Sequence, residues 1–157
     1  MKRIESKIFG IFEVDDSKDV GIFKDMNNNL LERNISHLYI SKSTLSDDDS
    51  INKTITFFDN IDQWNQIGRQ YLEESNDEEI NKYFDFYIEE VPEVFKTNEP
   101  KKLTKKEKIN SLILYSMASH GSKKEQKFVL NFTLGYDQIL CLKFDTEFKI
   151  IGVAWES

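Results

Sequence analysis

Two histidines are the side chains in this sequence best suited to proton transfer near neutral pH. His37 lies between Ser36 and Leu38 inside an expected strand, and His120 precedes Gly121 in an expected turn. Neither belongs to a recognisable catalytic or metal-binding motif. We therefore interpret both as structural or simply exposed residues.

Cys141 is the single cysteine, so it cannot form an internal disulfide. It would be a nucleophile if a histidine and an acid met it in space. Its neighbours Leu140 and Leu142 instead predict a buried, apolar position, which raises the pKa of a thiol and suppresses the reactive thiolate. We predict an inert thiol. The sequence leaves open whether His37, His120 and Cys141 converge.

The acidic run Asp47–Asp49 resembles part of a calcium-binding loop. Counted from Asp48, however, position 6 is Lys53 instead of the glycine that the turn needs, and position 12 is Asp59 instead of glutamate. We therefore predict a solvated loop over Ser46–Ser50. No histidine or cysteine cluster suggests zinc, and no glycine-rich pattern would cradle a phosphate, so we expect no metal and no cofactor.

The formal net charge of -7 argues against binding of nucleic acid, which is itself negatively charged. The lysines of Lys101–Lys108 and Lys123–Lys127 are not interleaved with aromatic residues, and we interpret both groups as solvated loops. Whether Lys101–Lys108 is helical stays open. The chain has no apolar run of about 20 residues, and charges occupy its first positions where a signal peptide would be apolar. We expect a cytoplasmic protein without a membrane partner.

An acidic patch is the strongest candidate for a binding surface. It lies on and just before an expected helix and consists of Glu74, Asp77, Glu78, Asp85 and Glu89. Lys82 is the only cation there. Two interpretations remain: a solvated helix face that keeps the protein soluble, or a docking surface for a basic protein partner.

Length and composition favour one domain over residues 1–157. The 12 Phe, 6 Tyr and 2 Trp supply bulky material for a core. The charge is uneven, since residues 1–100 carry 11 Lys and Arg against 22 Asp and Glu, whereas residues 101–157 carry 10 against 6. We interpret Thr97–Pro100, where the balance changes, as a loop inside one domain, because 57 residues would be marginal as a separate fold.

Hydrophobic periodicity predicts two amphipathic helices in the middle of the chain. The first has the stripe Ile61, Trp64, Ile67, Tyr71 and Leu72, with Asp59 or Asn60 as its cap. The second has the stripe Ile80, Tyr83, Phe84, Tyr87, Ile88 and Val91 and opens with the capping-box spacing Ser75–Glu78. Pro92 ends it near Glu90.

Alternation and turns predict strands elsewhere. The C-terminal third gives 128–134, 139–144 and 148–155, with a turn at Gly135, Tyr136 and Asp137. Ser111–Met117 is a strand or the end of a helix begun at Thr104. Near the N-terminus we expect strands around 8–14 and 35–40 and a turn at Asp25–Asn29. The predicted class is α+β, an antiparallel sheet packed against the two helices.

The final strands resemble a bacterial family catalogued as domain of unknown function two-thousand-and-four. The likeness rests on Phe132–Gly135, Tyr136-Asp137, Ile139–Asp145 and the terminal strand ending in Trp155-Glu156-Ser157, together with the pair Phe9-Gly10. It implies a fold and a bacterial cytoplasmic setting. It implies no activity and therefore no catalytic residue.

Three functions follow as hypotheses. The first is a non-enzymatic protein-binding protein of the immunity or accessory type, since no catalytic constellation is visible and an acidic surface suits a basic partner. The second is a small hydrolase or transferase whose site is assembled from dispersed residues. The third is a homodimeric scaffold in which an open sheet edge pairs with itself.

Overall fold

The computed structural model describes residues 1–135 and 137–157, so Tyr136 of the expected turn lies outside the described residues. Within them the strands form a hairpin of β1 (Lys2–Ser6) and β2 (Gly10–Val14) and a separate six-stranded sheet in the order β3-β4-β5-β6-β7-β8. The larger sheet consists of β3 (Val20–Phe23), β4 (His37–Ile40), β5 (Ile113–His120), β6 (Lys127–Gly135), β7 (Gln138–Phe144) and β8 (Ile150–Glu156). Its neighbours are antiparallel except β4 and β5, which are parallel.

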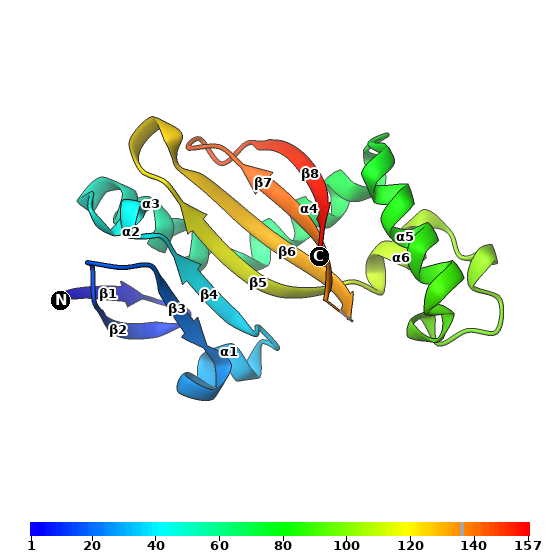
Figure 1. Ribbon diagram of the computed structural model, residues 1–157, viewed down its shortest axis with the longest axis horizontal. Helices are drawn as coiled ribbons and strands as arrows, with labels where there is room; N and C mark the ends of the chain where they lie inside the picture. Colours follow the sequence, from blue (N-terminus) through cyan, green and yellow to red (C-terminus); the bar gives the residue numbers. More distant parts are fainter. Residues whose placement is uncertain (136) are drawn as a thin grey trace.

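The helices contact this sheet from one side. They are α1 (Asn28–Glu32), α2 (Lys42–Leu45), α3 (Asp48–Asp59), α4 (Ile61–Glu74), α5 (Glu78–Glu90) and α6 (Lys105–Asn110). Short 3-10 turns cover Lys24–Met26, Pro92–Phe95, Pro100–Lys102 and Lys123–Glu125. In Figure 1, α4 passes behind the sheet, and α5 and α6 lie beyond one end of it. The expected α+β class is confirmed.

Phe57 of α3 is the centre of an aromatic cluster that joins two helices to the sheet. Its ring centroid lies 4.9 Å from Phe128, 5.7 Å from Trp64, 5.3 Å from Phe144 and 6.0 Å from Phe148. Phe57, Phe128 and Phe144 are fully buried. Because each buried aromatic removes a large apolar area from water, this cluster is a major source of the folding free energy.

Gly68 lets α4 approach the sheet closely. A Cβ atom at this position would lie 3.0 Å from Cδ2 of Leu142 and 3.3 Å from Cδ1 of Leu130. The predicted stripe instead placed Ile67 on the inner face, and this is wrong, because Ile67 is 36% exposed. A pattern of large apolar residues cannot identify a helix face on which the closest contact is made by a glycine.

The inner stripe of α5 is confirmed, and two of its tyrosines also bind the β6–β7 turn. The buried hydroxyl of Tyr83 donates to the carbonyl of Gln138 at 2.9 Å and accepts from the N–H of Leu134 at 3.1 Å. The hydroxyl of Tyr87 donates to the carbonyl of Gly135. These bonds fix the helix to the end of the hairpin. The helix ends at Glu90, as Pro92 predicts.

The predicted capping box at Ser75–Glu78 is wrong. Asp77 is the cap of α5, and its carboxylate accepts from the N–H of Glu79 at 2.9 Å. A true capping box begins α6, where Thr104 and Glu107 bond to each other's backbone N–H groups. The spacing of the two residue types occurs in both places, and only the local backbone decides which one caps a helix.

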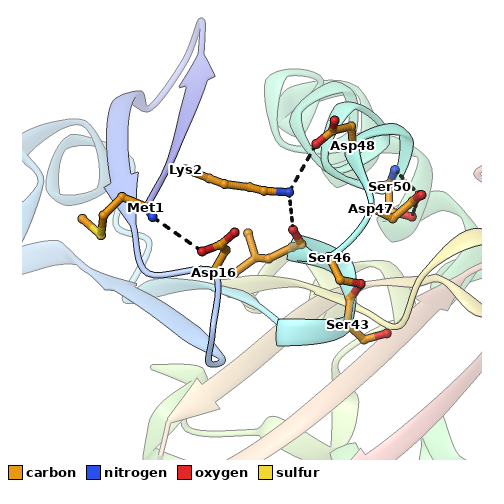
Figure 2. A network of polar contacts seen from close by, with 9 residues as sticks. Met1, Lys2, Asp16, Ser43, Ser46, Asp47, Asp48 and Ser50 are labelled. Atoms are coloured by element: carbon orange, nitrogen blue, oxygen red, sulfur yellow. Dashed lines mark hydrogen bonds and ion pairs between the residues drawn. The ribbon is translucent and has the colours of Figure 1, made fainter.

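The predicted loop over Ser46–Ser50 is also wrong, because α3 begins there. Asp47 caps the helix by accepting from the N–H of Ser50 at 3.0 Å, and Lys2 bonds to Asp48 at 3.2 Å (Figure 2). The first turn of a helix favours negative charge, so an acidic run that resembles a solvated loop serves as a helix start.

The other end of α3 and the start of α4 also depart from expectation. Asp59 does not cap α4, since its carboxylate accepts from the hydroxyl of Ser6 at 2.6 Å and ties the hairpin to α3. Asn60 occupies the cap position without a side-chain cap bond, because its amide donates to the carbonyl of Thr56 at 2.8 Å.

The N-terminal third has more structure than predicted. The sequence analysis placed strands around 8–14 and 35–40, whereas the chain forms β1 to β4 there. The expected turn at Asp25–Asn29 is a 3-10 turn followed by α1. Of the two readings of Ser111–Met117, the strand is correct. The lysine-rich segment 101–108 contains a 3-10 turn and α6 instead of a loop.

Trp64→Ala should lower the free energy of unfolding by about 3–5 kcal/mol, because it removes a large buried ring that stacks on Phe57. The matched control on the same helix is Ile67→Ala, which should cost less than about 1 kcal/mol because Ile67 faces outward. Urea unfolding curves measure both values. Equal losses would show that the inner face of α4 is misassigned.

Candidate functional site

The face of the large sheet opposite the helices is a candidate site that sequence reasoning did not identify. We call it the open face, because Figure 1 shows no helix in front of it. Strand register places its residues in two central rows. One row is Gly21, Tyr39, Ala118, Val129, Lys143 and Gly152, and the next is Phe23, His37, Ser116, Asn131, Cys141 and Ala154.

A hollow of about 390 Å³ lies on the β5–β8 half of the open face. Its lining residues are His120, Lys127, Val129, Asn131, Cys141, Lys143 and Glu156. Val129 and Cys141 are 5% and 3% exposed although no helix covers them. Their short side chains lie between longer neighbours, so they form the floor of the hollow.

Both histidines lie on this face and contact aromatic rings. The ring of His37 lies 5.6 Å from Phe23 and 5.6 Å from Tyr115, and the ring of His120 lies 5.0 Å from Tyr39. Burial lowers the pKa of His37, and partial burial is also the main cause that lowers the pKa of His120. Burial therefore shifts both imidazoles toward the neutral form, and the nearby carboxylates of Asp19 and Glu156 oppose this shift in the pKa of His120.

The three residues with catalytic potential share a face without forming a catalytic arrangement. In the described part of the chain no hydrogen bond joins His37 or His120 to the Cys141 thiol or to a carboxylate. Burial raises the pKa of Cys141 to about 12, so the thiolate is scarce at neutral pH. The prediction that Cys141 is buried is confirmed.

The predicted acidic patch divides into exposed and structural members. Glu78, Asp85 and Glu89 are exposed and occupy positions i, i+7 and i+11 of α5, which project from one side of a helix. We call these three residues the acidic stripe. Glu74 is exposed at the end of α4 and accepts from Gln70 at 3.2 Å. Asp77 is the cap of α5 and belongs to the fold.

Two of these acids lie where the helix dipole disfavours them. Glu74 is in the last turn of α4 and Glu89 in the last turn of α5, where neither helix has a basic residue. No ion pair involves Glu74 or the acidic stripe among residues 1–135 and 137–157. Residues that break a local stability rule without compensation are concentrated at functional sites.

The nearby lysines of α6 are engaged elsewhere. Lys105 donates to the carbonyl of Ser75, and the ammonium of Lys108 lies 6.0 Å from the ring centroid of Phe84. Lys105 thus ties α6 to the end of α4, and Lys108 contacts the inner side of α5. Lys82 is therefore the cation that remains on the side of α5 that carries the acidic stripe, and no ion pair joins it to these acids among the described residues.

Across the described positions, no three His, Cys, Asp or Glu side chains are grouped so that they could hold a metal ion. In the same part of the chain, every helix is too short or too polar to cross a bilayer.

The sequence does not predict the open face, because the face is formed by strands that lie far apart in the chain. The alternation in β6 already separates inward Leu130 and Phe132 from outward Val129 and Asn131. Outward positions on three further strands carry His37, His120 and Cys141. The missing information was strand order, which no local pattern contains.

Comparisons of this chain with family models, with curated proteins and with solved structures find no match. The resemblance of the final strands to a bacterial family therefore stays a prediction.

Cys141 should react slowly with a thiol reagent in the native protein and quickly in urea, because its pKa is raised to about 12 and its side chain is buried. Absorbance of a released chromophore measures both rates at one pH. Equal rates in the two states would contradict the position of the thiol.

The histidines should make stability depend on pH. A histidine whose pKa is lower in the folded than in the unfolded state takes up a proton on unfolding. Its contribution to the free energy of unfolding is therefore fully present above the unfolded-state pKa of 6.5 and is lost as the pH falls. We expect the urea midpoint to fall as the pH drops below 6.5. The carboxylates with a lowered pKa make stability depend on pH only near and below their ordinary pKa of 3.8 to 4.5.

The double variant His37→Gln/His120→Gln should flatten this fall. Urea midpoints between pH 7.5 and about 5 make the comparison. A wild-type midpoint that stays constant over this range, or an unchanged slope in the double variant, would show that neither imidazole is held neutral by the fold.

Proposed function

We propose that the protein is a non-enzymatic protein-binding protein of the immunity or accessory type, which docks a basic protein partner on the acidic stripe. The observation that carries this proposal is the exposure of Glu78, Asp85 and Glu89 on one side of α5 without a neutralising ion pair. A partner with a lysine- or arginine-rich surface would supply the missing positive charge.

The state of the potentially catalytic groups supports a function in binding. The Cys141 thiol has a raised pKa, and in the described part of the chain the two histidines contact aromatic rings and make no hydrogen bond to a carboxylate. A general base needs a partner within hydrogen-bond reach, and a nucleophile needs an activating base. Neither condition is met by these residues.

The attachment of α5 supports a role in docking. Tyr83 and Tyr87 bond to the β6–β7 turn, and α5 also packs against β8. A surface helix held this firmly presents its outer charges in a fixed geometry. Preorganisation of this kind reduces the entropy that binding costs.

The setting of the proposal is a bacterial cytoplasm, which the resemblance of the final strands implies. An immunity-type protein there would neutralise a basic toxin such as a nuclease. Attraction between an acidic and a basic surface accelerates such an encounter.

The charge-reversed variant Glu78→Lys/Glu89→Lys tests the acidic stripe. A tagged wild-type protein captures partners from native lysate at low salt, the captured protein is purified, and its association rate is measured. The rate should fall steeply between 0.1 M and 1 M salt, where the Debye length drops from about 10 Å to about 3 Å. It should also fall about tenfold or more in the variant.

The matched control is Glu13→Lys/Asp25→Lys, which makes the same change in net charge at exposed acids of β2 and of the turn before α1. It should associate almost as fast as wild type. Equal slowing by the two variants would show that only net charge matters and would remove the acidic stripe as the docking site. Melting curves confirm that both variants are folded.

A further inference from the structure

We propose that the open face is a self-association surface, on which two copies of this chain pack sheet against sheet about a two-fold axis. The proposal is independent of the acidic stripe and of any basic partner. It rests on the distribution of size and charge over the two central rows of the face.

The open face has a bulky half and a small half. Its β3–β4 side carries the rings of Phe23, His37 and Tyr39, and Phe23 is 48% exposed. Its β6–β8 side has a floor of short side chains, Val129, Cys141 and Ala154, within a hollow of about 390 Å³ whose rim carries the longer Lys127, Lys143 and Glu156. The change occurs at β5, where Ser116 and Ala118 lie.

This division makes the face complementary to itself. A two-fold axis that runs parallel to β5, midway between the two sheets, places the aromatic half of each copy over the hollow half of the other. Such an interface is isologous, so every contact is made twice. Two sheets packed face to face interdigitate their side chains in this way at a separation of about 10 Å.

The charge of the face is also suited to a second copy. The whole chain has a net charge of -7, so two copies repel each other across most of their surfaces. The hollow has no net negative charge. The carboxylate of Glu156 lies 3.8 Å from the ammonium of Lys143, and Lys127 adds a second positive charge on the rim. A copy of the same acidic protein therefore meets little repulsion at this face.

The sheet edges are less suited to pairing, which was the form of homodimer considered from sequence. In β8 the register shifts beside Ile151, and the carboxylate of Glu79 accepts from the N–H of Trp155 at 3.4 Å. Bulges and covered N–H groups are devices that protect an edge strand. The opposite edge, β3, is only 4 residues long.

Sedimentation velocity over a range of concentrations tests the proposal. The wild-type protein should form a species of twice its mass of 18.5 kDa. Phe23→Asp removes an exposed ring from the bulky half, and Ala154→Arg fills the hollow half with a charged side chain. Each should weaken self-association by about tenfold or more. The control Ile11→Asp changes an apolar residue on the separate hairpin that is even more exposed than Phe23, and it should leave self-association unchanged.

Two results would overturn the proposal. One is a monomer at every concentration up to millimolar. The other is a dimer that both open-face variants leave intact, which would place the contact at a sheet edge. Melting curves accompany each variant, and if one variant unfolds, the other carries the test, since Phe23 and Ala154 lie on opposite halves of the face.

Discussion

The structure depends on the packing of large aromatic side chains against one face of a six-stranded sheet. Phe57 is in ring contact with residues from α4, β6 and β7 at once, and Gly68 allows α4 to lie close enough to close the cluster. This arrangement uses the inward positions of β6 and β7 for Phe128, Phe132 and Phe144. The order of strands and the placement of the helices follow from the need to bury these rings together.

This packing also determines which residues remain for the outward positions of the same strands. With the bulky residues inside, β6 to β8 present Val129, Cys141 and Ala154 on the open face, while Phe23 and Tyr39 remain on the far strands. Burial lowers the pKa of both histidines on this face and raises that of Cys141. The two proposals therefore assign function to surfaces, the acidic stripe on α5 for a basic partner and the open face for a second copy.

Periodicity predicted the elements whose faces are made of large residues. The inner stripe of α5 and the strands β6 and β7 were predicted correctly, because large apolar residues recur at regular spacing along a buried face. Prediction failed where a contact is made by an unexpected residue type, as at Gly68, or where a polar side chain serves the backbone, as at Asp47. Short elements such as α1 and β3 carry too few periods to be recognised.

The two candidate surfaces also differ in how far the sequence alone could predict them. The acidic stripe is local, so helix spacing alone brought Glu78, Asp85 and Glu89 together. The open face combines segments from 20–40 and 113–156, including a parallel pair of strands whose connection runs over residues 41–112. Its composition could be read strand by strand, but the adjacency of His37 and Ser116, on which the division into two halves depends, requires the tertiary structure.

The thiol of Cys141 offers the most direct test of the central claim that the open face is an interface, because it lies on the floor of the hollow that a second copy would cover. The rate of its modification in the native protein is measured from micromolar to millimolar chain concentration with the reagent in constant excess. The account predicts a rate that falls as the chain concentration rises, and a loss of this dependence in Phe23→Asp. A wild-type rate that is the same at every concentration would contradict it.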